Sequence, residues 1–222
     1  LENRLNILTK DVTNKKAIHI TSLNIVSLPK HFEDHKSMGL IIESDILCLN
    51  EISLNPDVNK KSLQFPGYKL LFAGWTGHKD GVGIYLKKTL KEERPPTHIT
   101  NAAFQMLCLH FTDFEVLAAY RSPSYNTRSE KEAFVEALKE QLDGQKTTFI
   151  LGDMNEEPTD DSIIYSALSN VGFQQVVKQP THMGGRILDH IYIPQQTQSI
   201  VSEAIVYPCH FSDHDIVSIS VH

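Results

Sequence analysis

Features that mark secreted, membrane-spanning and low-complexity proteins are scarce in this sequence. Its 222 residues include only three cysteines, an odd number, with no close pair, which excludes the disulfide framework of small secreted domains. Cys48 and Cys108 lie in apolar segments, so we expect buried thiols in a reduced, intracellular setting. No apolar run approaches the ~20 residues that span a bilayer, and no signal peptide opens the chain. We therefore expect no membrane partner.

Linkers and internal repeats are also missing. No segment combines proline, glycine and serine into a flexible tether, although the chain has 11 glycines and 10 prolines. With 41% hydrophobic residues, the chain is long enough for one large core, and we expect a single domain over residues 1–222. The opening dipeptide Leu1-Glu2 is typical of a cloning scar. We therefore expect a domain that is monomeric in isolation and was excised from a larger polypeptide.

An excess of positive charge is absent too. The formal net charge is -6 and the sequence pI is about 6.0, which argues against broad nonspecific adhesion to polyanions. It does not exclude a nucleic-acid substrate, because a local basic rim can coexist with an acidic metal site.

The most informative stretch runs from Thr147 to Asn155. Thr147 to Leu151 is a short apolar run that predicts a strand buried on both faces, and Gly152 is expected to break it. Asp153 and Asn155 follow, and in an extended segment their side chains point to the same side. Such an acid can accept a proton or hold a cation, and such an amide can bind a phosphoryl oxygen. Taken alone, the pattern is equally typical of a strand that ends in a polar turn.

Apolar segments and their spacing predict an α/β sandwich. Strands with several hairpins, among them one around the glycine-containing loop 74–81, combine with one strand–helix–strand unit near the start of the chain. This mixture favours a sandwich over a parallel doubly wound sheet. The expected strands are 17–23, 45–49, 68–73, 82–87, 104–111, 114–120, 147–151, 173–177, 187–193, 200–206 and 216–221, and the expected helices are 30–43, 128–142 and 161–170.

Polar residues stand at the ends of many of these strands. They are Asn24, Glu51, Tyr120, Asp153, Asn155, Asp189, Asp213 and His214. In the order Ser-Leu-Asn, Asn-Glu, Tyr-Arg-Ser-Pro, Gly-Asp-Met-Asn, Leu-Asp-His-Ile and Ser-Asp-His, the chain resembles the endonuclease/exonuclease/phosphatase superfamily over residues 18–221. Deoxyribonuclease I and the apurinic/apyrimidinic endonucleases belong to that group. Each motif alone is weak, but their joint order is specific.

Within the superfamily, the sequence is most similar to the endonuclease domains of LINE-type retrotransposons and related Helitron-like elements. The turn that starts at Tyr120, the segment Pro180-Thr181-His182 and the closing Ser212-Asp213-His214 carry this likeness. It implies a four-layered α/β sandwich, in which two mixed, mainly antiparallel β-sheets pack face to face with helices outside. It also implies one active site at the sheet edges.

The resemblance implies a role for each site residue. Mg²⁺, with Mn²⁺ as a substitute, is expected at Glu51, Asn24 and Asp213, since carboxylate and amide oxygens suit hard cations. Asp153 would orient or deprotonate the attacking water, and His214 would face the phosphate with its ring set by Asp189. The remaining expectations are that Asn155 holds a non-bridging oxygen, Tyr120 donates to the phosphate or tunes Asp153, and Thr181 and Ser212 lie beside the substrate.

The favoured function is a Mg²⁺-dependent DNA endonuclease that nicks one strand and leaves a 3′-hydroxyl, acting in the nucleus. Expected DNA backbone contacts are Arg121, Arg128, Lys178 and Arg186, each of which could instead be solvated surface. His182, His190 and His210 are expected not to bind metal. The alternatives are an inositol or lipid phosphatase on the same scaffold and an inactive binding module, against which the intact set of site residues argues.

Departures from the family pattern sharpen these expectations. Ile52 follows Glu51 where relatives commonly have a hydroxyl, and Val26 stands where some repair enzymes carry another acidic ligand. A second metal is therefore less expected. Glu156 and Glu157 occupy the place where phosphatases often have a basic residue, which disfavours the phosphatase alternative. The loop from Thr181 to Asp189 is short for deep insertion into a DNA groove.

Overall fold

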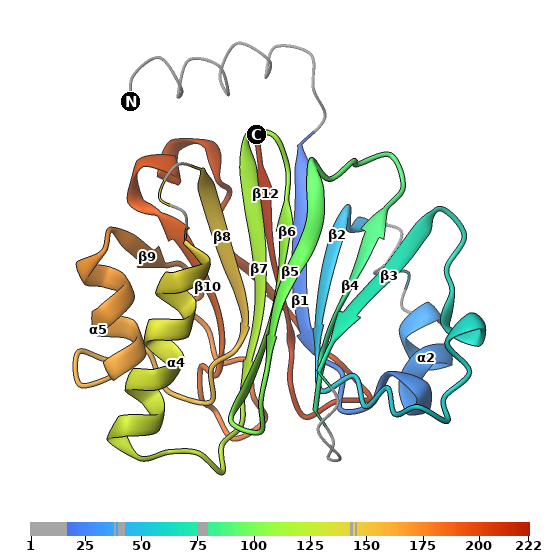
Figure 1. Ribbon diagram of the computed structural model, residues 1–222, viewed down its shortest axis with the longest axis horizontal. Helices are drawn as coiled ribbons and strands as arrows, with labels where there is room; N and C mark the ends of the chain where they lie inside the picture. Colours follow the sequence, from blue (N-terminus) through green and yellow to red (C-terminus); the bar gives the residue numbers. More distant parts are fainter. Residues whose placement is uncertain (1–16, 38, 40–42, 75–79, 143, 145) are drawn as a thin grey trace.

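Two six-stranded sheets lie face to face, and helices cover their outer faces (Figure 1). The computed structural model describes residues 17–37, 39, 43–74, 80–142, 144 and 146–222. The arrangement is the predicted four-layered α/β sandwich. No helix in these residues is long and apolar enough to cross a membrane.

The first sheet carries the amino-terminal unit. Its only parallel pair is β1–β2, so the ends of these two strands lie at the same edge. Helix α2 (Leu28–Ser37) packs on its outer face through Leu28 and Phe32. In spatial order the strands are β11 (Ile205–Tyr207), β12 (Ile216–Val221), β1 (Ile18–Asn24), β2 (Ile46–Asn50), β4 (Val82–Lys87) and β3 (Tyr68–Ala73).

The second sheet has a matching parallel pair, β7–β8. Helices α4 (Arg128–Gln141) and α5 (Ile163–Asn170) cover its outer face through Phe134, Leu138 and Ile164. Thr127 begins α4 with a reciprocal capping box. In spatial order the strands are β5 (Arg94–Thr100), β6 (Phe104–His110), β7 (Phe114–Arg121), β8 (Thr147–Asp153), β10 (Asp189–Pro194) and β9 (Phe173–Gln175).

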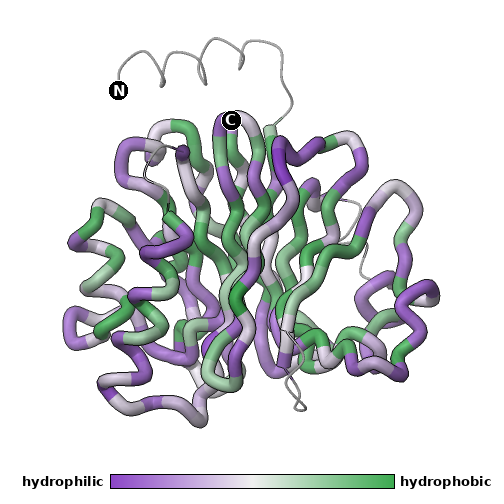
Figure 2. The backbone as a smooth tube through the Cα atoms, viewed as in Figure 1, coloured by the Kyte–Doolittle hydropathy of each residue, from purple (hydrophilic) through white to green (hydrophobic). Residues whose placement is uncertain are grey.

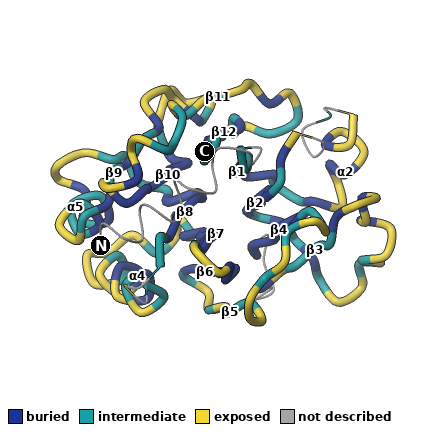
Figure 3. Tube along the Cα trace, turned by 90° about the horizontal axis from the view of Figure 1, so that it is seen from above, coloured by how far each residue is buried: buried dark blue, intermediate teal, exposed yellow. Residues whose placement is uncertain are grey.

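Apolar side chains from both sheets fill the space between them. Ile20, Cys48, Ile84, Leu109 and Phe149 belong to this central cluster. Hydrophobic strand centres and polar connecting loops show the same division (Figure 2), and the buried positions follow the strands in both sheets (Figure 3). Alternate residues of each strand face the core, so the other set faces the helices, and both faces of the inner strands are buried. The three cysteines are buried and free, as expected.

The strand–helix pattern was predicted well, but several boundaries and one element were wrong. Helix α2 ends at Ser37 rather than at residue 43; residues 38 and 40–42 lie outside the described residues, as do residues 75–79 of the expected hairpin loop. Helix α5 starts at Ile163 rather than at residue 161, and the Ser162 side chain caps it. The predicted strand 200–206 is shorter and starts later, as β11 (Ile205–Tyr207), and its first predicted residue, Ile200, ends a 3₁₀ helix, η2 (Gln195–Ile200).

Strand β5 was missed because it contains Pro95 and Pro96. Proline has no backbone N–H, so it is confined to edge strands and bulges. β5 is an edge strand, and its register with β6 shifts between Arg94 and Thr97. Gly152 was expected to break its strand, yet β8 continues through Gly152 to Asp153, which pairs with Asp189 of β10.

Candidate active site

The two parallel pairs bring the polar strand ends to one edge of the sandwich, the lower edge in Figure 1. Asn24 and Asn50 are aligned at the ends of β1 and β2, and Tyr120 and Asp153 are aligned at the ends of β7 and β8. The edges of the two sheets meet there, because side chains of β1 and β8 contact each other directly. Residues that are more than a hundred positions apart in the sequence therefore form one cluster.

Asn24 joins two carboxylates from opposite sheets. Its Nδ2 donates to Glu51 Oε1 at 2.9 Å and to Asp153 Oδ2 at 3.0 Å. Its Oδ1, the atom expected to bind metal, accepts the Val26 N–H at 3.1 Å. In this arrangement Asn24 fixes the spacing of the two acids. Metal binding through its oxygen stays a prediction.

Asp153 is fully buried and surrounded by groups that act on its charge. Burial and the negative charge of Asp189 raise the pKa of Asp153 to about 7, against the opposing effects of His214 and the hydrogen bonds from Asn24 and Asn155. Asn155 donates its backbone N–H to Asp153 Oδ1 at 2.9 Å. An isolated carboxylate in this position would be costly to bury, so these donors are part of what keeps it in place.

Asn155 does not continue the strand. Its φ is +49°, in the left-handed region, so the predicted extended geometry of this segment is wrong. The side chain nevertheless meets Asp153, because the local turn brings Nδ2 to 3.0 Å from Asp153 Oδ2 and 2.8 Å from the Arg121 carbonyl oxygen. Both amide protons are thereby used within the protein. Glu51 also has a positive φ, +52°, and strain of this kind gathers at functional sites.

His214 and Asp189 form the predicted pair. His214 Nδ1 lies 2.8 Å from Asp189 Oδ2, and its Nε2 lies 3.9 Å from Asp153 Oδ2. Burial lowers the pKa of His214, but the hydrogen bond with Asp189 and the charges of Asp189, Asp153 and Asp213 outweigh it and raise the pKa to about 9. The imidazolium ring therefore lies between two buried carboxylates, with Nε2 toward Asp153.

Tyr120 completes the inner part of the cluster. Its side chain is buried, and burial, the charges of Glu51 and Asp153, and a hydrogen bond with Glu51 all raise its pKa. The hydroxyl therefore remains protonated and serves as a donor. The expected role of Tyr120, to donate to the phosphate or to tune Asp153, stays a prediction.

Two residues predicted to contact substrate are instead enclosed. Arg121 is 1% exposed and donates to the carbonyl oxygens of Met154, Tyr125 and Asn155 at 2.8, 2.7 and 2.9 Å. Burial lowers its pKa. The expected contact of Arg121 with DNA does not fit this placement; its guanidinium ties the 121–126 loop to the loop after β8. The expectation failed because the chain stays in the sheet through Arg121.

Thr181 has the same kind of supporting position. It is 0% exposed, and its Oγ1 accepts the backbone N–H groups of Leu188 and Asp189, each at 3.0 Å. The hydroxyl thus fixes the start of β10, where Asp189 meets His214. Direct contact of Thr181 with a substrate does not fit this burial.

The remaining predicted residues line the outside of the cluster. Ser212 donates to the Asn24 carbonyl at 2.7 Å and accepts the His214 N–H at 3.1 Å. The Asp213 carboxylate lies 3.5 Å from His182 Nε2, and in the described residues no contact joins it to Glu51. Arg128, Lys178 and Arg186 are exposed. Arg128 pairs with Glu132 and Arg186 with Glu157, so both are held at the surface by single acids.

Asn50 is the residue that the sequence analysis missed as a part of the site. From the end of β2 it crosses to the other sheet, where its Nδ2 donates to the Ala119 carbonyl at 3.0 Å and its Oδ1 accepts the Asp153 N–H at 3.1 Å. It is 0% exposed. An asparagine at a strand end is typical of a turn, so only the packing of the sheets distinguishes this one.

Replacing Asn50 by Ala is expected to lower the free energy of unfolding by about 2 to 4 kcal/mol, because two buried backbone groups lose their partners. Asn50→Asp should destabilise at least as much as Asn50→Ala, because a buried carboxylate oxygen would then face the Ala119 carbonyl oxygen. Urea unfolding monitored by circular dichroism measures both. A loss below about 0.5 kcal/mol for Asn50→Ala would contradict the proposed link between the sheets.

The donor set of the cluster fits a hard divalent cation. Glu51 is only partly buried, and in the described residues Asp189 Oδ1 is buried without a hydrogen-bond partner. Asp153, Asp189 and His214 place one ligand atom each within 4.8 Å of one another. Carboxylate oxygens of this kind are what Mg²⁺ and Mn²⁺ bind. His182 Nδ1 accepts the Gly184 N–H at 3.0 Å, and His182 lies with Asp213 and His214 in another group of side chains that could hold a metal ion. The expectation that His182 does not bind metal stays a prediction.

Comparison with known proteins identifies this arrangement. The sequence pattern of the Endonuclease/Exonuclease/phosphatase family matches residues 20–214. The chain belongs to this family. Members are nucleases and phosphatases that typically depend on a divalent metal, so the chain is a hydrolase of the nuclease/phosphatase type. No curated protein sequence matches the chain.

Solved structures of the family share the fold at low sequence identity. A 3′-5′ exonuclease from Neisseria meningitidis superposes with a TM-score of 0.73 and 17% identity, covering 92% of this chain and 99% of its own. An AP endonuclease from Archaeoglobus fulgidus superposes with a TM-score of 0.71 and 15% identity, and the match covers 92% of this chain and 99% of the AP endonuclease. The human Nocturnin catalytic domain with bound sulfate superposes with a TM-score of 0.69 and 16% identity, and the match covers 92% of each chain. At these identities the likeness supports the fold alone.

Proposed function

We propose that the chain is a Mg²⁺-dependent DNA endonuclease that hydrolyses one phosphodiester bond and leaves a 3′-hydroxyl. The observation that carries the proposal is the continuous set of contacts from Asp189 through His214 and Asp153 to Asn24 and Glu51. It places an acceptor for the proton of water, a cationic ring and an outer carboxylate in one cluster. These are the groups that in-line attack on a phosphodiester requires.

In this mechanism each side chain has one task. Asp153 Oδ2 accepts a proton from the attacking water, whose oxygen forms the new bond to phosphorus. His214 faces the phosphate and offsets the negative charge that develops on its oxygens, while Asp189 holds the ring orientation. The bond from phosphorus to the 3′ oxygen breaks, and that oxygen takes a proton from water to give the 3′-hydroxyl. Glu51 would hold Mg²⁺, which when bound would stabilise the negative charge on the phosphoryl and leaving oxygens.

We further propose that this domain makes the target nick for a mobile genetic element of the LINE or Helitron-like type. The motif order around Tyr120, Thr181 and Ser212 supports this more specific assignment. In that role the domain would be fused to others, would be monomeric by itself and would act on nuclear DNA. The 3′-hydroxyl would then prime synthesis of new DNA.

DNA is favoured over a small phosphate ester by the charges around the site. The two acids after Asn155 are engaged with cations: Glu156 with Lys131 at 3.3 Å and Glu157 with Arg186 at 3.4 Å. No basic side chain follows Asn155 to hold a terminal phosphate. A phosphodiester, which carries one charge instead of two, therefore suits this rim better. One solved relative is described as a 3′ phosphatase bound to a product DNA hairpin, which makes 3′-end trimming the second candidate.

A panel of substrates separates these activities. The purified chain with Mg²⁺ is incubated with supercoiled plasmid, an abasic duplex, a duplex ending in a 3′-phosphate and an inositol phosphate. The proposal predicts conversion of supercoiled plasmid to the nicked form, with ends that a polymerase can extend directly. Release of phosphate from the inositol substrate without nicking would support the phosphatase alternative instead. Trimming of the 3′ end alone would support the second candidate.

Arg186 offers a separate test of DNA contact. Its side chain is half exposed and pairs with Glu157. Arg186→Ala should weaken DNA binding and make the slope of log K against log salt less steep by about 0.9, the value of one lost phosphate contact. The single-turnover rate at saturating enzyme should be nearly unchanged.

The matched control is Arg128→Ala, which removes an exposed, acid-paired arginine at the start of α4. Its salt dependence of DNA binding shows whether Arg128, at the start of α4, also contacts DNA. An unchanged salt slope for Arg186→Ala would exclude Arg186 as a phosphate contact.

A further inference from the structure

A second pocket lies on the first sheet, far from the cluster described above. Its cavity has a volume of about 470 Å³, within the range of small-molecule sites. His19 and Ser220, at the pocket, are cross-strand partners at the opposite end of β1 and β12 from Asn24 and His214. The pocket is on the outer face, because Ile20 and Ile219 between these residues point into the central core.

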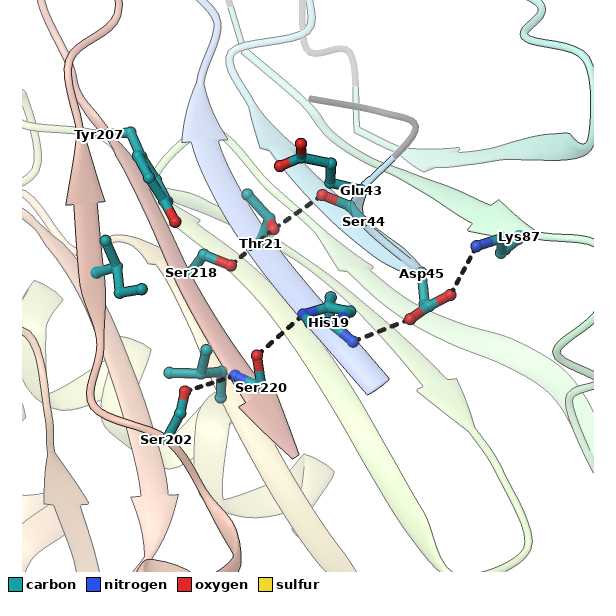
Figure 4. Close-up of a pocket in the computed structure, with 12 residues that line it drawn as sticks. His19, Thr21, Glu43, Ser44, Asp45, Lys87, Ser202, Tyr207, Ser218 and Ser220 are labelled. Carbon is teal, nitrogen blue, oxygen red and sulfur yellow. Dashed lines mark hydrogen bonds and ion pairs between the residues drawn. The ribbon is translucent and has the colours of Figure 1, made fainter. Parts of the chain in front are cut away.

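The floor of the pocket is a row of hydroxyl groups that are hydrogen-bonded to one another (Figure 4). Ser44 donates to Thr21 Oγ1 at 2.9 Å, and Ser218 donates to the Ile20 carbonyl at 3.3 Å. Thr21 Oγ1 and Ser218 Oγ lie 3.1 Å apart, and either hydroxyl can donate the hydrogen bond between them. Hydroxyl oxygens accept hydrogen bonds, so this row can receive the N–H groups of a ligand.

The walls carry a carboxylate and an aromatic ring. Figure 4 shows the Glu43 carboxylate directed over the hydroxyl row from one side and the Tyr207 ring on the other. Glu43 is exposed and makes no contact in the residues that the structure describes. Tyr207 is 43% exposed, so part of its ring face is accessible. A carboxylate and an aromatic face are the two groups that attract an organic cation.

Positive charge in the pocket is already neutralised. Lys87 Nζ lies 2.9 Å from Asp45 Oδ1, and the other oxygen of Asp45 accepts the His19 N–H at 3.0 Å. His19 Nδ1 is 2.9 Å from Ser220 Oγ. An anionic ligand would therefore find no unpaired cation. A bare divalent metal is also disfavoured, because only one carboxylate, that of Glu43, is without a partner in the described residues.

We propose that this pocket binds an organic cation through its guanidinium or ammonium group. The charge lies between Glu43 and the Tyr207 ring, and its N–H groups donate to Thr21 and Ser218. The cation is either a free small molecule or an arginine side chain of a peptide partner, since both present the same group. The site is independent of the hydrolytic cluster, so its occupancy does not require the proposed nuclease function.

The test uses ¹⁵N NMR titration of the whole chain at low salt with agmatine, the blocked peptide Gly-Arg-Gly, sorbitol and inorganic phosphate. Agmatine should bind saturably at millimolar concentration and shift amide signals of β1, β11 and β12. Glu43→Gln keeps the shape and removes the charge, so it should weaken binding about tenfold. Tyr207→Leu should weaken it several-fold. Glu203→Gln, an exposed acid outside the pocket, is the matched control and should change nothing.

The arms of the experiment also distinguish the source of the cation. Saturable binding of the peptide supports a protein partner's arginine, and binding of agmatine alone supports a free small cation. Equal affinity of the original chain and Glu43→Gln would overturn the proposal. So would the absence of saturable binding by both cations, or binding of sorbitol or phosphate in their place. Plasmid nicking, measured on the same samples, should be the same for Glu43→Gln and the original chain.

Discussion

Replacing His214 by Ala should lower the single-turnover rate of DNA cleavage about 100-fold or more, the usual contribution of a positioned acid–base group. Asp189→Ala should cost a similar factor, because the ring then loses its fixed tautomer and the charge that supports it. The 2.8 Å contact between His214 Nδ1 and Asp189 Oδ2 makes the two residues one unit. Once His214 is Ala, removal of Asp189 should therefore cost little more in rate.

Rates alone could mix catalysis with folding, so each variant is also followed by thermal unfolding. Asp189 is fully buried in β10, and its removal is expected to change stability, whereas the rate comparison uses only folded, DNA-saturated enzyme. Asp189→Asn keeps a hydrogen-bonding oxygen without the charge and should retain more of the rate than Asp189→Ala. His210→Ala, at an exposed position, is the control with an unchanged rate. Multiplicative losses in the double variant would show that His214 and Asp189 act independently.

Gly152→Ala should destabilise the protein by more than about 3 kcal/mol, among the largest effects of a single methyl group. A Cβ at Gly152 would lie 1.8 Å from the Ala119 carbonyl oxygen of the adjacent strand, and φ is +143°, a conformation that L side chains rarely adopt. The same carbonyl accepts the Asn50 Nδ2. Strand β8 can shift only by pulling Asp153 away from Asn50 and Asn24, so cleavage should be lost with stability.

The control for Gly152→Ala is Gly144→Ala. Gly144 also has a positive φ, +67°, but a Cβ there would meet nothing within 4 Å, so only the backbone strain of about 1 kcal/mol is expected. Chemical unfolding of the two variants separates the clash from the strain. Equal losses would mean that the close approach of β7 and β8 at Gly152 does not constrain the site.

The sequence predicted the fold where the hydrophobic pattern was long or alternating. The continuous apolar run of the strand from Thr147, which is buried on both faces, and the amphipathic helix from Arg128, which buries one face, are examples. The secondary-structure prediction was wrong where the conformation that a residue type can adopt depends on its position in the sheet. Pro95 and Pro96 argued against a strand, and only their place at the sheet edge makes β5 acceptable.

Part of the candidate site could be predicted because buried polar groups need partners. A carboxylate such as Asp189 in an apolar strand needs a partner, and His214 supplies it. The sequence could not specify in which direction a polar side chain points. Arg121 follows Tyr120 in a loop-like motif, yet its guanidinium faces backbone carbonyls inside the protein. The Asn50 side chain resembled that of a turn residue, and only the packing of the two sheets shows its partners on β7 and β8 of the opposite sheet.

Nicking of supercoiled plasmid with and without Mg²⁺ tests the central claim most directly, when the original chain is compared with Asp153→Asn. The claim is that one cluster, which contains Glu51, Asp153 and His214, performs metal-dependent hydrolysis of a phosphodiester. We expect nicking by the original chain in Mg²⁺, none in chelator, and none by Asp153→Asn in either condition. Undiminished nicking in chelator, or by Asp153→Asn in Mg²⁺, would contradict the account.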